Sequence, residues 1–167
     1  GMGCDIFHAR AVERVCQYKK IDPKKANLSF ICYDLSHIAE YAKVNNDVFK
    51  LMKKNLPGPF TFILNATSNL PKLFRNKKTV GIRVPDNNVI REIVRTLGNP
   101  ILSTSVRDDN DDVLEYYTDP ELMDEKLSHF VDCVINSGYG SLEPSTVVDC
   151  TGDEPVIVRQ GKGILEY

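Results

Sequence analysis

The hydrophobic positions of this chain recur with two different periods. Between residues 8 and 20, apolar side chains return every three or four positions opposite charged ones, and this spacing predicts an amphipathic helix. Capping residues and similar spacing predict helices over residues 34–43, 45–55 and 87–97. Short apolar runs bounded by glycine or proline predict strands. These runs cover residues 28–33, 60–65, 79–84, 100–104, 131–136, 145–150 and 155–159.

The order of these elements indicates the fold class. Strands alternate with helices over most of the chain, which is typical of an α/β sheet, while the strand-rich last third favours a mixed sheet over a purely parallel one. The 167 residues suit one domain of ordinary size, and no internal repeat or long linker divides them. We therefore expect a single domain over residues 1–167.

Composition narrows the class of protein. Hydrophobic residues make up 42% and charged residues 26% of the chain, which is typical of a globular protein, and no apolar run reaches the roughly 20 residues of a membrane span. The net charge of −2 means that a nucleic-acid site would have to be a local patch. Five cysteines without Cys-x-x-Cys spacing predict small core residues in a reducing cytoplasm, with no metal site, and the three histidines are expected at the surface.

Polar and basic residues cluster at the ends of the predicted strands, where open α/β sheets commonly bind ligands. Cations and hydroxyl groups together suit an anionic ligand, because both can bind phosphate oxygens. Each cluster taken separately also has a simpler interpretation without a ligand. The lysines would form a solvated face, the serines would be turn residues at strand ends, and the arginines would make ion pairs at the surface. The clusters comprise Lys19, Lys20, Lys24 and Lys25, then Arg83, then Ser103, Thr104 and Ser105, and finally Ser145, Thr146 and Arg159.

The order of four motifs resembles the YrdC family, and the resemblance covers nearly the whole chain. The motifs are Leu-Pro-Gly-Pro-Phe-Thr-Phe-Ile-Leu at 56–64, Thr-Val-Gly-Ile-Arg-Val-Pro at 79–85, Pro-Ile-Leu-Ser-Thr-Ser at 100–105, and Pro-Ser-Thr-Val-Val-Asp at 144–149 followed by Val-Arg-Gln-Gly at 158–161. Gly-Cys-Asp-Ile at 3–6 and the helix around residues 11–16 resemble the YciO branch most closely.

The resemblance implies a twisted, open mixed sheet with flanking helices and a basic concave cleft. It further implies chemistry similar to that of threonylcarbamoyl-AMP synthases, which combine ATP, threonine and bicarbonate for tRNA modification, with Mg²⁺ accompanying ATP as substrate and no resident metal. By matched motif, the nucleotide side would comprise Lys19, Thr79, Ser105 and Arg159. The threonine side would comprise Arg83, Ser103 and Ser145, with Lys20, Lys24 and Lys25 as basic support. No catalytic side chain is assigned, because positioning and cations can carry adenylyl transfer.

Three departures from the family pattern favour impaired turnover. Ile21 replaces the arginine of the Lys-x-Arg signature, and Arg107 replaces the asparagine of Ser-x-Asn. The family's opening strand and Pro-Thr-Asp-Thr loop are expected before Gly3, so the chain resembles an N-terminally truncated relative. Such a sheet would have an unpaired edge and could associate into a homo-oligomer. The acidic run at 108–112 is expected to be a solvated loop.

A second class of function stays open. The same basic residues could make a non-catalytic module that binds double-stranded RNA or tRNA. Because both functions need phosphate-binding cations, the motifs do not separate them.

Overall fold

The computed structural model describes residues 1–26, 28–106 and 117–167. These residues form two compact units, the first made of residues 1–104 and 145–167 and the second of residues 105–144. The first unit carries the sheet and the second carries a helix. Residue 107, with its departure from the family pattern, and the acidic run at 108–112 lie outside the described residues.

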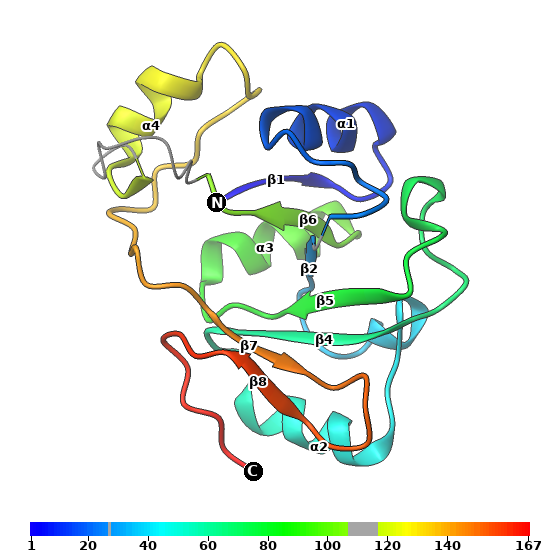
Figure 1. Cartoon of the computed structure of the whole chain (residues 1–167). Coiled ribbons are helices and arrows are strands. Elements are labelled where there is room, and N and C mark those ends of the chain that lie inside the picture. The colour runs from blue at the N-terminus through cyan, green and yellow to red at the C-terminus, as the bar shows by residue number, and fades with distance from the viewer. Residues whose placement is uncertain (27, 107–116) are drawn as a thin grey trace. The chain divides into compact units, whose positions relative to one another are not determined.

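An open mixed sheet of eight strands forms the first unit (Figure 1), which confirms the predicted fold class. The strands lie in the order β1-β6-β2-β5-β4-β7-β8, and β3 pairs with β4. The pairs β2–β5 and β4–β7 are parallel and the other pairs are antiparallel. The strands are β1 (Met2–Asp5), β2 (Ser29–Ile31), β3 (Ala42–Lys43), β4 (Phe60–Ala66), β5 (Thr79–Arg83), β6 (Ile101–Thr104), β7 (Thr146–Asp149) and β8 (Val156–Arg159).

The two faces of the central sheet differ in chemistry because successive strand residues point to opposite sides. One face, the core face, is apolar and buried, and it carries Phe30, Phe62, Ile82, Leu102 and Val148. The rings of Tyr41 and Phe74 pack edge-on against Phe30. We call the other side the polar face, defined by Ser29, Thr61, Thr79, Arg83 and Ser103 together with Ser145 and Arg159 at the β7–β8 end.

Helices α1 (Ala9–Tyr18), α2 (Asn46–Asn55) and α3 (Asn88–Leu97) begin where the sequence places a capping side chain. The side chains of His8, Asn45 and Asn87 each accept a hydrogen bond from a backbone N–H in the first helical turn. Gly98, in the left-handed conformation at φ 78°, ends α3. Ile90, Ile93 and Val94 of α3 pack against Ile31 and Ile101, so α3 covers the end of β2 on the side of the polar face.

The predicted helix over residues 34–43 is wrong. The chain there forms a short 3-10 helix, η1 (Ile38–Glu40), followed by β3. Asp34 accepts a hydrogen bond from the N–H of Ser36, so its side chain closes a local turn instead of capping an α-helix. A second 3-10 helix, η2 (Lys72–Phe74), lies between β4 and β5. Strand β1 was not predicted, because a four-residue strand containing glycine carries little pattern.

In the second unit, the predicted strand over residues 131–136 is wrong, because those residues adopt no regular structure and are mostly exposed. The unit instead contains α4 (Pro120–Leu127), which the sequence reasoning missed. Asp119 caps this helix and proline occupies its first turn, the arrangement that favours a helix start. Pro120 and Leu127 are buried, and the Lys126 ammonium lies 5.4 Å from the centre of the Tyr117 ring.

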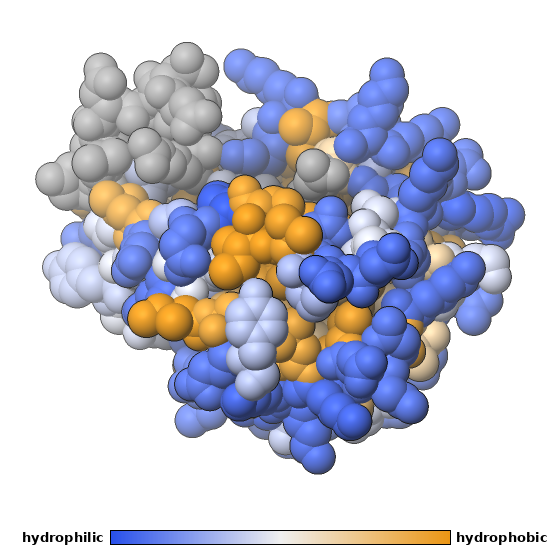
Figure 2. Space-filling view, turned by 60° about the horizontal axis from the view of Figure 1, so that its bottom comes forward, coloured by the Kyte–Doolittle hydropathy of each residue, from blue (hydrophilic) through white to orange (hydrophobic). Residues whose placement is uncertain are grey.

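Strand β8 is the most exposed strand of the sheet. It lies at one end of the strand order, with relative exposures of 57% for Val156, 38% for Ile157 and 54% for Val158. Its pairing with β7 is interrupted by a bulge, since Val147 faces Arg159 while the next residue of β7 faces Ile157. Figure 2, which brings the β8 and α2 end of Figure 1 forward, shows apolar surface broken up by polar side chains.

The exposure of the cysteine and histidine side chains agrees with the sequence predictions at all but one position. Cys16, Cys32 and Cys150 are buried free thiols and Cys4 is half-buried, as expected, whereas Cys133 is exposed and the prediction is wrong there. The three histidines are exposed, as predicted. Within the described parts of the chain, no helix is long and apolar enough to cross a bilayer.

Candidate functional site

Strand register brings the predicted strand residues to the polar face. Thr79 and Arg83 lie on one side of β5, an even number of residues apart and about 13 Å along the strand. Ser103 pairs with Ser29, which pairs with Gly81 between them. Ser29 donates a hydrogen bond from its hydroxyl to the Ser103 carbonyl at 3.3 Å. Ser103 is therefore level with the middle of β5.

Gly81 keeps the middle of this face shallow. A Cβ atom at this position would lie 3.2 Å from both the Ser29 Cβ and the Thr61 Cγ2, closer than side chains ordinarily pack. The residue therefore has no room for a larger side chain without movement of its neighbours. A glycine at such a position lets another group approach the backbone closely.

Hydroxyl groups and an arginine meet where β4, β7 and β8 come together. The Thr61 and Ser145 hydroxyl oxygens lie 3.1 Å apart. Arg159 donates from Nε at 3.2 Å and from Nη2 at 2.8 Å to the Ser145 carbonyl, and Nη2 lies 3.4 Å from the Ser145 hydroxyl. Two of the predicted residues, 14 positions apart in sequence, are thus in direct contact. Strand alternation could have added Thr61 to the predicted set.

Arg83 is the most unusual group of this face. Its Nε is the one buried side-chain nitrogen or oxygen, among the described residues, that lacks a hydrogen-bond partner. Burial, and secondarily the charge of Arg159, lowers the pKa of the Arg83 guanidinium from its ordinary value. A buried donor beside a second cation is costly in the free protein, and an anionic ligand would satisfy both groups at once.

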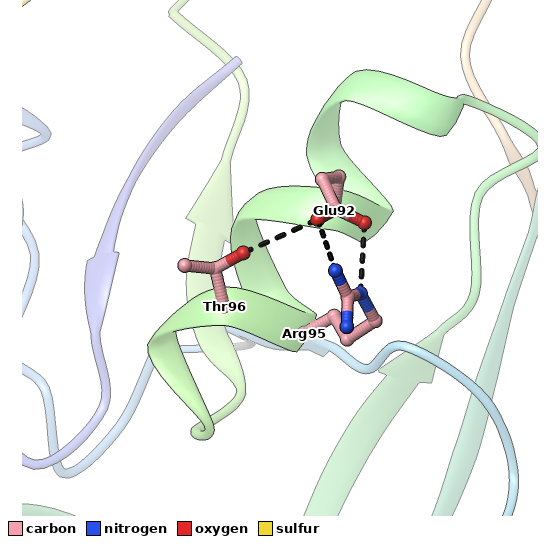
Figure 3. A network of polar contacts seen from close by, with 3 residues as sticks. All are labelled: Glu92, Arg95 and Thr96. Atoms are coloured by element: carbon pink, nitrogen blue, oxygen red, sulfur yellow. Dashed lines mark hydrogen bonds and ion pairs between the residues drawn. The ribbon is translucent and has the colours of Figure 1, made fainter.

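Arg95, a surface arginine on α3, differs from Arg83 because it has a carboxylate partner. Arg95 donates to both carboxylate oxygens of Glu92, at 2.8 Å from Nε and 2.5 Å from Nη2, while Thr96 contacts the same carboxylate (Figure 3). Its charge is neutralised within the helix. Within the described residues, Arg83 has no such carboxylate partner, so its positive charge remains available.

Lys19 and Lys20 lie at the end of α1, on the loop that leads to β2. Lys20 has a left-handed backbone at φ 53°, its N–H bonds to the Gln17 carbonyl, and the N–H of Ile21 bonds to the Cys16 carbonyl. This is the Schellman arrangement, in which the residue after the left-handed one is commonly apolar. The half-buried Ile21 therefore has a local structural reason to replace the family's arginine.

The remaining predicted residues lie elsewhere. Lys24 and Lys25 are exposed on the loop before β2, where the Lys77 ammonium bonds to the Ala26 carbonyl and joins this loop to the segment before β5. Ser105 is exposed and begins the second unit, so it is not part of the polar face as described.

A depression of about 360 Å³ is lined by a different set of residues. It is bounded by the end of β2, by η1 and by the end of α3, with Tyr33, Asp34, His37 and Arg95 in its wall, and it includes none of the predicted site residues. Those predicted residues that belong to the polar face instead lie on a partly exposed side of the sheet. Among the described residues, no group of three His, Cys, Asp or Glu side chains is arranged to hold a metal ion.

Comparison with known proteins identifies relatives over nearly the whole chain. The family model Sua5_yciO_yrdC, described as telomere recombination, matches residues 1–161. An uncharacterized protein of Haemophilus influenzae is 42% identical over 164 residues, which cover 97% of this chain and 78% of that protein. A putative threonylcarbamoyl-AMP synthase of Methanocaldococcus jannaschii is 32% identical over 162 residues, covering 96% and 74%.

Solved structures agree with this fold. The crystal structure of Escherichia coli YciO has a TM-score of 0.84 at 40% identity and covers 97% of this chain and 78% of that one. A crystal structure of P. abyssi Sua5 complexed with L-threonine has a TM-score of 0.81 at 23% identity, covering 95% and 46%, and is similar in fold.

Proposed function

Since the chain belongs to the family of Sua5, YciO and YrdC proteins, we propose that its polar face binds ATP and threonine. The observation that carries the proposal is the buried, unpartnered Nε of Arg83 beside the second cation, Arg159. The Thr61 and Ser145 hydroxyls supply further donors next to the Arg159 guanidinium. Two anionic groups, a carboxylate and a triphosphate, match two neighbouring cations.

The proposed roles follow the motifs that the chain shares with the family. Arg83, Ser103 and Ser145 hold the threonine carboxylate and hydroxyl, and Arg159 and Thr79 contact the nucleotide, with Lys19 reaching phosphate from the α1 loop. Lys20, Lys24 and Lys25 supply basic support. The similarity in fold to Sua5, which binds L-threonine in the solved complex, supports the threonine assignment.

The proposed reaction is synthesis of threonylcarbamoyl-AMP at low turnover. The threonine amine attacks the carbon of bicarbonate, water leaves, and a carboxylate oxygen of the resulting carbamate attacks the α-phosphorus of ATP. Pyrophosphate leaves with its charge shared by Mg²⁺ and the cations of the site. Ile21 removes one guanidinium that could hold phosphate by two hydrogen bonds, so nucleotide affinity should survive better than turnover.

Two measurements on the same preparation test this proposal. Calorimetry with ATP and Mg²⁺ should detect binding, and a pyrophosphate-release assay with threonine and bicarbonate should give a weak, threonine-dependent rate. Arg83→Met should abolish the threonine dependence, whereas the matched control Arg95→Met, whose guanidinium is paired on α3, should not.

Failure to bind ATP would contradict the proposal. If duplex RNA then bound with a steep salt dependence that Lys24→Ala and Lys25→Ala flatten, the RNA-binding alternative would be correct.

A further inference from the structure

The hydroxyl of Thr146 lies at the centre of a buried hydrogen-bond network. Thr146 is fully buried at the start of β7. Its Oγ1 donates to the Gly163 carbonyl at 2.6 Å and accepts from the Gly161 N–H at 3.0 Å. The Gln160 amide nitrogen donates to the same Gly163 carbonyl at 2.7 Å and lies 3.4 Å from the Thr146 hydroxyl. One hydroxyl therefore fastens the start of β7 to the segment that follows β8.

This network lies next to the contact between Ser145 and Arg159. Thr146 directly follows Ser145, and Gln160 directly follows Arg159. Arg159 itself is exposed, and a long exposed side chain loses much rotamer freedom when it is held in one place. Its position over the Ser145 carbonyl depends on a fixed spacing between the two backbones.

The bulge between β7 and β8 makes that spacing sensitive. Because Arg159 faces Val147 while Ile157 faces Val148, Val158 is the extra residue of the bulge. Bulges change the direction of neighbouring side chains, and the ladder no longer fixes the register there. The buried network supplies the fixed point immediately beyond the bulge.

We propose that Thr146, assisted by Gln160, is a positioning residue that holds Arg159 over Ser145 in the orientation that receives the nucleotide. The proposal rests on the proposed function, in which Arg159 contacts ATP. Removal of the Thr146 hydroxyl leaves the Gly161 N–H without its acceptor and weakens the hold on the Gly163 carbonyl. The segment after β8 is then released, and Arg159 has to be ordered by the ligand itself.

The test compares isosteric variants in the full chain. Thr146→Val keeps the shape but removes the hydroxyl, and it should weaken ATP·Mg²⁺ binding roughly tenfold by calorimetry, the equivalent of one ordinary hydrogen bond. Thr146→Ser keeps the hydroxyl and should restore most of the affinity. Asn87→Ala removes the cap of α3 and is the control for a general loss of stability.

A spectroscopic readout separates positioning from stability. The Arg159 Nε–Hε resonance, identified by its loss in Arg159→Ala, reports the hydrogen bond to the Ser145 carbonyl. It should shift or broaden in Thr146→Val and stay in place in Thr146→Ser and Asn87→Ala. If Thr146→Val does not fold, Gln160→Ala removes only the exposed amide of the network and should show the same change to a smaller degree.

The outcomes distinguish this inference from the function on which it rests. If Arg159→Ala binds ATP as well as the wild type, the proposed nucleotide role of Arg159 is wrong. If Arg159→Ala weakens binding but Thr146→Val leaves both affinity and resonance unchanged, the positioning role alone is wrong. An equal loss of affinity in Asn87→Ala at equal loss of stability would also overturn it.

Discussion

Replacing Arg83 with methionine should stabilise the ligand-free protein while it abolishes threonine-dependent activity. The Nε of Arg83 is buried without a hydrogen-bond partner, and an unsatisfied buried donor costs about 1–3 kcal/mol. Methionine keeps a flexible apolar stem of similar length, so most packing contacts of the arginine stem remain. The substitution also removes the repulsion from Arg159 that, together with burial, lowers the Arg83 pKa.

We expect a net gain of roughly 1–2 kcal/mol in the free energy of unfolding. The gain is smaller than the largest cost of an unsatisfied donor because part of the methionine side chain stays accessible to water. For a protein of this size, that gain corresponds to a rise in melting temperature of roughly 2–8 °C. Urea titration and a thermal melt measure both quantities, with pyrophosphate release measured on the same samples.

The matched control is Arg95→Met. Arg95 is exposed and paired with Glu92 in a single helix, so its replacement should leave the urea midpoint unchanged within error (Figure 3). A lower urea midpoint for Arg83→Met than for the wild type would refute the reasoning. It would mean that the Arg83 guanidinium already stabilises the ligand-free protein and is not left unsatisfied until an anion binds.

Three further substitutions test the packing around the sheet. Phe62→Ala should lower the free energy of unfolding by about 3–5 kcal/mol in urea titration, because Phe62 is completely buried on the core face; a loss below about 1 kcal/mol would contradict that packing. Gly163→Ala should lower the melting temperature, because a Cβ there would lie 2.5 Å from the Phe60 ring, whereas Gly152→Ala, with open space around its Cβ position, should not. Burial raises the pKa of the Cys32 thiol to about 12 from 9.0. Between these values the unfolded chain ionises its thiol while the folded protein does not, so the free energy of unfolding is unaffected at neutral pH and falls as the pH rises through that interval. The urea midpoint should therefore fall less steeply between about pH 9 and about pH 12 in Cys32→Ala than in the wild type, and equal slopes would contradict the burial of this thiol.

The elements that could be predicted from the sequence are those with one buried face, because that face produces a regular pattern of apolar residues. Strand β4 alternates buried and half-buried residues, β5 is a short apolar run with half-buried ends, and α3 has its apolar residues at helical spacing between Asn87 and Gly98. The sequence alone therefore locates these elements. Asp34 misled the prediction because the same carboxylate can cap a helix or close a turn, and only the tertiary structure decides between them.

The candidate site was predictable in its residue types but not in its contacts. Strand alternation and motif order are enough to predict Arg83 and Ser145 as site residues. Arg83 ends one strand of the sheet, and Ser145 directly precedes another. The contact of Arg159 with Ser145 depends on a bulge, and the role of Thr146 depends on a glycine carbonyl 17 residues away. A bulge in the cross-strand register and the distant partner of a buried hydroxyl are not encoded in a local sequence pattern.

The exposed strand β8 has a consequence for how the protein behaves when it is concentrated. A sheet edge that shows three β-branched side chains to solvent is a template on which another extended chain can add, the first step of cross-β growth. This edge carries its own gatekeepers. Pro155 offers no backbone donor at the start of the strand, the bulge at Val158 breaks the even spacing that an incoming strand needs, and Arg159 places a charge at the end. The irregular hairpin that aims Arg159 at Ser145 thus also protects the molecule from templated aggregation, and a redesign that regularised it would remove both properties together.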